Sequence, residues 1–346
     1  MNLATNTAVR HAELSQSDLI GRGLLSCPNC ESPLEQTAAS LTCGLCGQDW
    51  PIVEGVPHFG GTDPRHHQLT LGQRELIAQI AATKGWQVAL HDVLRRIDPT
   101  VYRQAADEYR AQWRYVAPLS ANSRVLDLSS GWGAIAFSLA ETCELVVAAD
   151  ACPAQTQLVA LRARQSGQDN LLSLQLGLDQ GLPFANGCFD AVVLLDAFSK
   201  ITDTKLQRLI LRRIHNVLRP NGSLFLADLN RLSVVLLAKR QALGNPHTLG
   251  GYRRLLHSVG FRGFRAYSPI PSHLEPFFMV PLDRRPPLTY FLRNILRTQD
   301  FRVHVRERGF ESRYALTRMM VRWIPATLAP PFAKLFAPSI AILAHK

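Results

Sequence analysis

The feature that most constrains the fold is an apolar run that leads into a turn of small residues, at positions 125–136. The run holds a carboxylate, Asp127, and the turn holds Gly131 and Gly133. An apolar-periodic helix follows, and a second apolar run then ends on Asp150. A glycine turn between strand and helix lets a ligand approach bare backbone, and an acid after the second strand can bind ribose hydroxyls. The segment therefore predicts the nucleoside-binding unit of a parallel α/β sheet.

The turn alone leaves two kinds of ligand open. Gly131 and Gly133 also fit the G-x-G-x-x-G/A pattern of dinucleotide-binding proteins. Asp127 favours the other choice, because a carboxylate inside the first strand suits a ligand with a cationic amino-acid end. The same carboxylate would repel a pyrophosphate. The residues therefore favour a cationic nucleoside over a dinucleotide.

Three later segments strengthen this interpretation. They are the G-L-P-F run from Gly181, the apolar run from Phe189 to Asp196, and the L-R-P-N-G run from Leu218. In order and spacing they resemble the later motifs of class I S-adenosylmethionine (SAM)-dependent methyltransferases, and the resemblance is close over residues 124–228. It implies SAM as the cofactor. It also implies an α/β fold with a doubly wound, Rossmann-like sheet whose last strand is antiparallel.

The resemblance further implies which residues bind the cofactor. The first strand and its turn would hold the methionine end, and Asp150 would accept hydrogen bonds from the ribose. Leu178 and Asp179 would lie at the edge of the adenine, and Asp196, at the end of the fourth core strand, would face the methyl group. The full set of cofactor-binding residues expected from the resemblance is Asp127, Ser129, Gly131, Gly133, Asp150, Leu178, Asp179 and Asp196.

The sequence departs from the family pattern at three of its positions. Ser129 replaces the first glycine of the turn, so the turn must tolerate a Cβ atom there. Asn221 replaces the first glycine of the pair before the fifth strand, and asparagine can adopt a left-handed conformation. Asp179 lies one residue from the usual place of the adenine-contacting acid.

A hydroxyl acceptor would benefit from a general base. The candidates are His273, which follows the predicted sixth strand, and His247, which is harder to place. A histidine is more often structural than catalytic, so both roles stay open at this point. The predicted catalytic residues are Asp196 and His273.

Two pairs of cysteines precede the nucleoside-binding unit. Cys27 and Cys30 form one C-x-x-C pair, and Cys43 and Cys46 form another. Four thiolates at this spacing can bind one Zn²⁺ tetrahedrally, although a single iron ion is an alternative. Four sulfur ligands leave no position for water, so the zinc should be structural. The aromatic-Pro-Ile run that follows resembles the end of Trm112-like zinc ribbons, which occur alone or fused to methyltransferases.

Length and composition allow one large and one small domain. The 346 residues are 47% hydrophobic and 19% charged, which is ordinary for a globular protein. We expect a flexible tail over residues 1–20, the zinc ribbon over 21–60, a helical linker or lid over 61–118 and the methyltransferase domain over 119–346. Three aromatic residues near the end of the linker suggest either a lid or ordinary packing, and they are Tyr109, Trp113 and Tyr115.

The connection before the last strand is unusually long and basic. If the last strand is antiparallel, a connection between the sixth and seventh strands begins and ends at the carboxyl-end rim of the sheet. Here it covers about residues 269–338, and eleven basic but only four acidic side chains lie between Asp283 and Lys334. Two amphipathic stretches, near residues 288–296 and 316–324, predict a helical insertion. It suggests an anionic substrate, nucleic acid or an anionic membrane surface as partner, or else helices packed on the domain.

The leading functional hypothesis is methyl transfer from SAM to a small-molecule or lipid-precursor acceptor. An RNA (rRNA or tRNA) methyltransferase is the first alternative. A non-catalytic adaptor that docks a partner through the ribbon is the second, and the intact set of Asp127, Gly131, Gly133 and Asp150 argues against it. No signal peptide or membrane span is recognisable and the cysteines suit a reducing compartment, so a cytoplasmic location is expected, with peripheral membrane contact left open.

Overall fold

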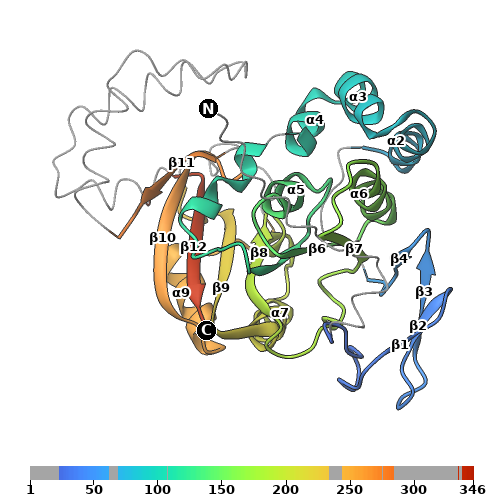
Figure 1. The fold of residues 1–346 in the computed structure, drawn as a ribbon. Helices are drawn as coiled ribbons and strands as arrows, with labels where there is room; N and C mark the ends of the chain where they lie inside the picture. Colours follow the sequence, from blue (N-terminus) through green and yellow to red (C-terminus); the bar gives the residue numbers. More distant parts are fainter. Residues whose placement is uncertain are drawn as a thin grey trace, which may run out of the picture. The chain divides into compact units, whose positions relative to one another are not determined.

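The computed structural model describes residues 23–61, 69–106, 108–233, 244–274, 276–283, 334 and 337–346 (Figure 1). The predicted tail at residues 1–20 and both amphipathic stretches of the predicted insertion lie outside the described residues. The chain divides into two compact units. The first comprises Met1–Ala106, Leu119–Ala191 and Asn216–Arg219, and the second comprises Asp107–Pro118, Val192–His215 and Pro220–Lys346.

The first unit begins with a small antiparallel sheet. Its strands are β1 (Glu35–Gln36), β2 (Ser40–Thr42), β3 (Asp49–Val53) and β4 (Val56–Pro57), and they lie in that order. The C-x-x-C pairs lie in the loops before β1 and between β2 and β3. This sheet with its loops (residues 23–61) is called the N-terminal module below.

Helices follow where the sequence predicts them. Helix α2 (Leu71–Lys84) starts at a capping box of Thr70 and Gln73 and stops at Gly85, whose φ is +95°. A π-helix, η1 (Val88–Leu94), continues into α3 (Arg95–Ile97), and α4 (Pro99–Ala106) begins at a proline, which a first helical turn accepts. Their buried side chains form a cluster that includes Trp132 and Leu158 of the following core. The predicted breaks at Gly85 and Pro99 are thus confirmed.

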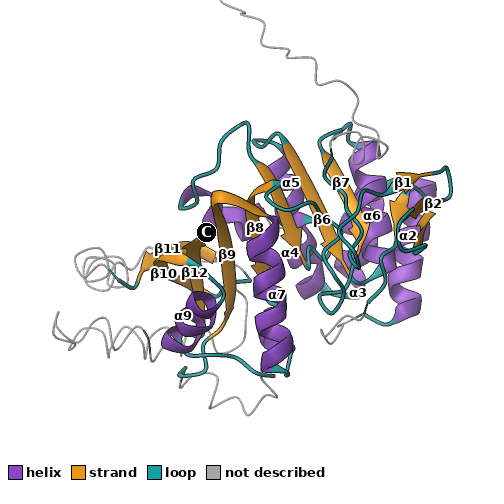
Figure 2. Ribbon diagram, turned by 90° about the horizontal axis from the view of Figure 1, so that it is seen from below, coloured by secondary structure: helices purple, strands orange, loops and turns teal. Residues whose placement is uncertain are grey.

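The core of the first unit is an alternation of strands and helices. Strands β5 (Arg124–Leu128), β6 (Leu145–Asp150) and β7 (Leu171–Gln175) pair in parallel. Helices α5 (Ala134–Ala140) and α6 (Pro153–Gln165) connect them and contact the strands (Figure 2). All residues of β6 and β7 are buried, as expected for parallel strands covered on both faces.

Strand β8 (Phe189–Leu195) pairs with β5 and runs from the first unit into the second. In the second unit β8 is followed by the short helix η3 (Phe198–Lys200), α7 (Thr204–Val217), β9 (Leu218–Leu229), α9 (Leu249–Ser258), β10 (Arg262–Pro271), β11 (Pro276–Pro281) and β12 (Ser339–His345). A 3-10 helix, η2 (Glu108–Tyr115), belongs to the same unit. The strands of the second unit lie in the order β11-β10-β12-β9-β8.

Strand β12 is antiparallel to both of its neighbours, β9 and β10. The predicted antiparallel last strand is therefore confirmed, and the fold is a mixed, Rossmann-like sheet. The sequence did not reveal β11, which pairs with β10 in a hairpin at the start of the segment predicted to be a helical insertion. Residues 284–333 of that segment lie outside the described residues.

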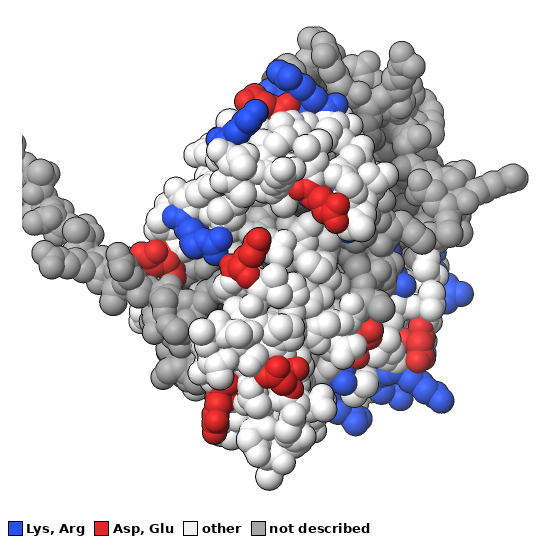
Figure 3. Space-filling model, turned by 90° about the vertical axis from the view of Figure 1, so that its right-hand side faces the viewer, with Lys and Arg blue, Asp and Glu red and all other residues white. Residues whose placement is uncertain are grey.

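None of the described helices is both long and apolar enough to cross a lipid bilayer. On the face drawn in Figure 3, basic and acidic side chains of the described residues are interspersed. The strongly basic part of the sequence, residues 284–333, lies outside the described residues.

Candidate functional site

The turn after β5 has the backbone conformation that a glycine-rich loop requires. Ser129, Gly131 and Gly133 all have positive φ, of +59°, +58° and +81°. Ser129 therefore adopts the left-handed conformation in spite of its Cβ atom, as expected from the sequence. Gly133 cannot be replaced easily, because a Cβ there would lie 2.9 Å from Cγ2 of Val159. The turn ends in α5, so backbone N–H groups at the start of a helix line it.

Asp150 points toward this turn. Its Oδ2 accepts a hydrogen bond of 2.7 Å from the backbone N–H of Gly131, and its Oδ1 accepts one of 3.0 Å from Cys152. The residue is fully buried at the end of β6. The carboxylate predicted to bind a ribose thus lies beside the glycine turn and holds its shape.

The other predicted cofactor residues of the first unit lie around the same strands. Asp127 is 1% exposed and is the last residue but one of β5. Leu178 is buried, and Asp179 next to it is partly exposed, in the loop after β7. Asp179 closely approaches Gly61 of the N-terminal module, since a Cβ on Gly61 would lie 2.6 Å from its Oδ1.

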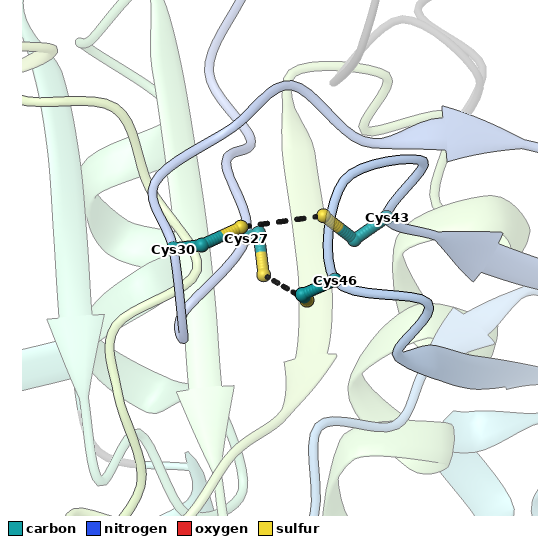
Figure 4. Close-up of side chains that lie close together, drawn as sticks. All are labelled: Cys27, Cys30, Cys43 and Cys46. Atoms are coloured by element: carbon teal, nitrogen blue, oxygen red, sulfur yellow. Dashed lines mark hydrogen bonds between the residues drawn. The ribbon is translucent and has the colours of Figure 1, made fainter.

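The four cysteines of the C-x-x-C pairs converge (Figure 4). Their Sγ atoms all lie within 4.8 Å of one another. The Sγ atoms of Cys27 and Cys46 are 3.5 Å apart, and those of Cys30 and Cys43 are 3.4 Å apart. Ligands of a tetrahedral Zn²⁺ with bonds of about 2.3 Å lie roughly 3.8 Å apart, so the cluster fits this ion closely.

The N-terminal module is attached to the core through Gln175, the last residue of β7. The backbone N–H of Phe59 donates to its carbonyl oxygen at 2.8 Å, and the N–H of Gly60 donates to its Oε1 at the same distance. The side-chain amide of Gln175 in turn donates to the carbonyl of Ala151, which follows Asp150. This role of Gln175 could not be predicted from the sequence, because the residue ends an ordinary strand.

A second polar cluster lies in the other unit. Asp196, just after β8, has a φ of +53°, which is strained for a residue with a side chain. Its Oδ1 lies 3.1 Å from Nε2 of His273, although 77 residues separate the two in sequence. His273 is 3% exposed and lies in the turn between β10 and β11. The two residues predicted to be catalytic are thus in contact.

Charges around Asp196 keep it ionised. Burial alone would raise the pKa of Asp196, but the hydrogen bond and charge of His273, together with the charges of Lys200 and Arg110, outweigh this effect and lower it. Lys200 Nζ is 3.7 Å from Oδ1 of Asp196. Asp196 therefore meets His273 as an ionised carboxylate.

Asp228 was not predicted from the sequence, and it joins this cluster from β9. Asp228 is 1% exposed. One carboxylate oxygen of Asp196, one of Asp228 and one ring nitrogen of His273 all lie within 4.8 Å of one another. Burial raises the pKa of Asp228, and the nearby charge of Asp196 raises it further. An acid inside the otherwise apolar run of β9 was the signal that could have identified it.

Two other residues singled out in the sequence have structural contacts. His247, the second candidate base, donates through Nε2 to Oε1 of Gln207 at 2.8 Å and lies against Phe198 and Tyr252. Trp113 is fully buried and stacks on Phe225 with ring centroids 4.6 Å apart. Trp113 is therefore a core residue and does not act as a lid.

Comparison with known proteins agrees with this geometry. Residues 126–226 match the protein family described as "Methyltransferase domain". The sequence is 34% identical over 115 residues to an uncharacterized methyltransferase of Synechocystis sp., which covers 33% of this chain and 51% of the relative. Residues 126–226 thus resemble a methyltransferase domain. The match begins in β5 and ends in β9, and so contains the glycine turn, Asp150 and Asp196.

A second relative is the ubiquinone biosynthesis O-methyltransferase of Xanthomonas axonopodis pv. citri, which is 32% identical over 111 residues, or 32% of this chain and 45% of the relative. The chain thus spans about half the length of the curated relatives it matches. Among solved structures, a Haemonchus contortus phosphoethanolamine N-methyltransferase aligns with 80% of this chain and 60% of its own, at 14% identity and a TM-score of 0.45. That likeness is distant.

Proposed function

We propose that the chain transfers a methyl group from SAM to a small-molecule acceptor. The observation that carries the proposal is the left-handed turn of Ser129, Gly131 and Gly133, with the carboxylate of Asp150 hydrogen-bonded to it. Such a turn exposes backbone N–H groups to a nucleoside and offers an acid for its ribose. The match of residues 126–226 to a methyltransferase domain supports the same ligand, and the O-methyltransferase among the relatives supports a small-molecule acceptor.

In this proposal the residues have distinct roles. Asp127, Ser129, Gly131 and Gly133 bind the methionine end, while Asp150 binds the ribose and Leu178 with Asp179 borders the adenine. SAM supplies the methyl group and its own leaving group, so the protein mainly aligns the acceptor and excludes water. Asp196 and His273 act on the acceptor. They are in contact, and the ring of His273 is shielded from solvent.

We assign a structural Zn²⁺ to the four cysteines of the N-terminal module. Their sulfur atoms are close enough to bind one ion, and together they fill a tetrahedral coordination shell. The ion would fix the two loops that carry the cysteines. The module would thereby present Phe59 and Gly60 to Gln175 in the orientation that the hydrogen bonds require.

Calorimetry with S-adenosylhomocysteine, the product form of the cofactor, tests the cofactor site. The zinc-loaded protein should bind it. Asp150→Asn should weaken binding by about 10- to 100-fold, because hydrogen bonds to a charged group contribute about 1.5–3 kcal/mol. Asp190→Asn is the matched control. Asp190 is also a carboxylate that accepts a backbone N–H, from Arg124 at 2.7 Å, but lies at the start of β8. Absence of binding by the unaltered protein, or equal weakening in both variants, would refute the assignment.

A further inference from the structure

His273 is held in one orientation by contacts at its backbone and at its ring. Its backbone N–H donates to Oγ of Ser339 at 3.0 Å. Its Nε2 lies 3.1 Å from Oδ1 of Asp196. The side chain is almost completely buried, so the ring cannot turn to solvent to find other partners.

The contact with Asp196 determines which ring nitrogen carries the proton. An ionised carboxylate has no proton to donate, so Nε2 must be the donor. In a neutral imidazole the other nitrogen, Nδ1, then carries a lone pair and is an acceptor. Nδ1 of His273 is buried and has no hydrogen-bond partner among the described residues. A buried polar atom without a partner costs about 1–3 kcal/mol, which is recovered when a ligand donates to it.

The charged groups around His273 are largely compensated by one another. Asp196 is close to Lys200 at 3.7 Å, and Arg110 adds a second positive charge near it. Asp228 accepts backbone N–H groups at both oxygens, from Ser199 and from Leu229, at 2.7 Å each. The hydroxyl of Tyr252 donates to the carbonyl of Leu229. The cluster therefore offers no uncompensated carboxylate to hold an ammonium group. In the neutral form of its imidazole, which is the form that can take a proton, His273 offers Nδ1 as the acceptor atom.

We propose that the acceptor is a hydroxyl compound, an alcohol or a phenol, and that Nδ1 of His273 takes its proton. The proposal rests on the methyltransferase function proposed above. The hydroxyl oxygen forms a bond to the methyl carbon of SAM as the carbon–sulfur bond breaks, and the electron pair of that bond stays on sulfur. The hydroxyl proton moves to Nδ1, and the imidazolium formed beside the carboxylate of Asp196 later releases it to water. One positive charge is thus exchanged for another.

A hydroxyl acceptor accounts for a base at the position of His273. A neutral hydroxyl is a poor nucleophile, and a positioned base accelerates its reaction by about 10²- to 10⁴-fold. A neutral amine carries its own lone pair and attacks without such help. A base that is held in one tautomer by a neighbouring carboxylate is therefore expected for a hydroxyl acceptor. In this arrangement Asp196 is a positioning residue and His273 is the proton acceptor.

Nitrogen NMR of the full-length, zinc-loaded protein with ¹⁵N-labelled histidine and bound S-adenosylhomocysteine tests the tautomer directly. We expect a protonated Nε2 and an unprotonated Nδ1 for His273. Asp196→Asn should change this pattern, because an amide can turn its N–H toward Nε2. The signals of His247, whose Nε2 is bonded to Gln207, serve as the internal control and should not move. A proton on Nδ1 in the unaltered protein would overturn the proposal.

Turnover separates the acceptor classes. Matched pairs of compounds that differ only in a hydroxyl or an amino group are tested for release of S-adenosylhomocysteine. Hydroxyl members should be methylated, and His273→Gln should lower that rate by about 10²- to 10⁴-fold with cofactor affinity unchanged. The proposal would be contradicted if the amino members were methylated, and at the same rate by His273→Gln as by the unaltered protein. Absence of cofactor binding by the unaltered protein would instead refute the proposed function, and the tautomer would then be read from spectra of the protein without S-adenosylhomocysteine.

Discussion

Replacement of Gly61 by alanine tests how the N-terminal module contacts the loop after β7. A Cβ atom at this position would lie 2.6 Å from Oδ1 of Asp179, 2.7 Å from Cα of Gly177 and 2.8 Å from Cγ of Gln180. The φ of Gly61 is +102°, a value that residues other than glycine rarely adopt. Gly60 is the matched control, since its φ is +77° but nothing lies within 4 Å of a Cβ placed on it.

The two substitutions separate backbone strain from close contact. A positive φ costs an alanine about 1–2 kcal/mol, and this cost is common to Gly60→Ala and Gly61→Ala. Forcing a methyl group against the backbone of Gly177 adds about 1–3 kcal/mol, as overpacking does elsewhere. Gly61→Ala should therefore destabilise the contact by about 1–3 kcal/mol more than Gly60→Ala.

Amide hydrogen exchange measures this difference locally. The N–H of Gly177 donates to the carbonyl of Gly60 at 2.8 Å and reports whether the contact is closed. Since about 1.4 kcal/mol corresponds to a factor of ten, exchange at Gly177 should be about 5- to 150-fold faster in Gly61→Ala than in Gly60→Ala. Equal exchange in the two variants would show that the module does not approach the loop as closely as described, and the reasoning would fail.

Three further predictions concern the core, the metal and the response to pH. Trp113→Ala should lower the free energy of unfolding by about 3–5 kcal/mol in urea titrations, because this ring is fully buried. Tyr115→Ala, at a ring that is 72% exposed, should change it by less than about 0.5 kcal/mol. Elemental analysis should find one zinc per chain, lost in Cys43→Ser but kept in Cys188→Ser, which alters a buried cysteine outside the cluster; loss in both would contradict the assigned ligands. Burial, aided by the charge of Lys346, lowers the pKa of His215 below its usual value of about 6.5. The unfolded chain therefore binds this proton first, so stability should fall as pH drops below about 6.5, and less steeply in His215→Asn; equal slopes would exclude this cause.

The parts of the fold that depend on local sequence were predictable. Ser129 and Asn221 stand where a left-handed residue is required, and both have positive φ, of +59° and +64°. Gly85 follows the last residue of α2 and Pro99 is the first residue of α4. Both boundaries were predictable because the backbone preferences of glycine and proline act within a few residues. The same holds for the cysteine pairs, whose spacing already limits how they can converge.

The remaining features depend on contacts between distant parts of the chain. Asp228 lies in an apolar run, and only the fold shows that Asp196 and His273 lie near it. Strand β11 exists because β10 extends to Pro271 and offers it a partner, which composition does not reveal. The place of His273 after β10 follows from the topology: because β12 is antiparallel to both β9 and β10, these two strands end at the same edge of the sheet.

The attachment of the N-terminal module also has a consequence for solubility. Strand β7 is the outermost strand of its sheet, and residues 58–60 run alongside it. Without them, outer N–H and C=O groups of a fully buried strand would be available to pair with a neighbouring molecule, as exposed strand edges do in aggregation. Loss of the metal should therefore appear first as self-association, with the remaining strands still folded.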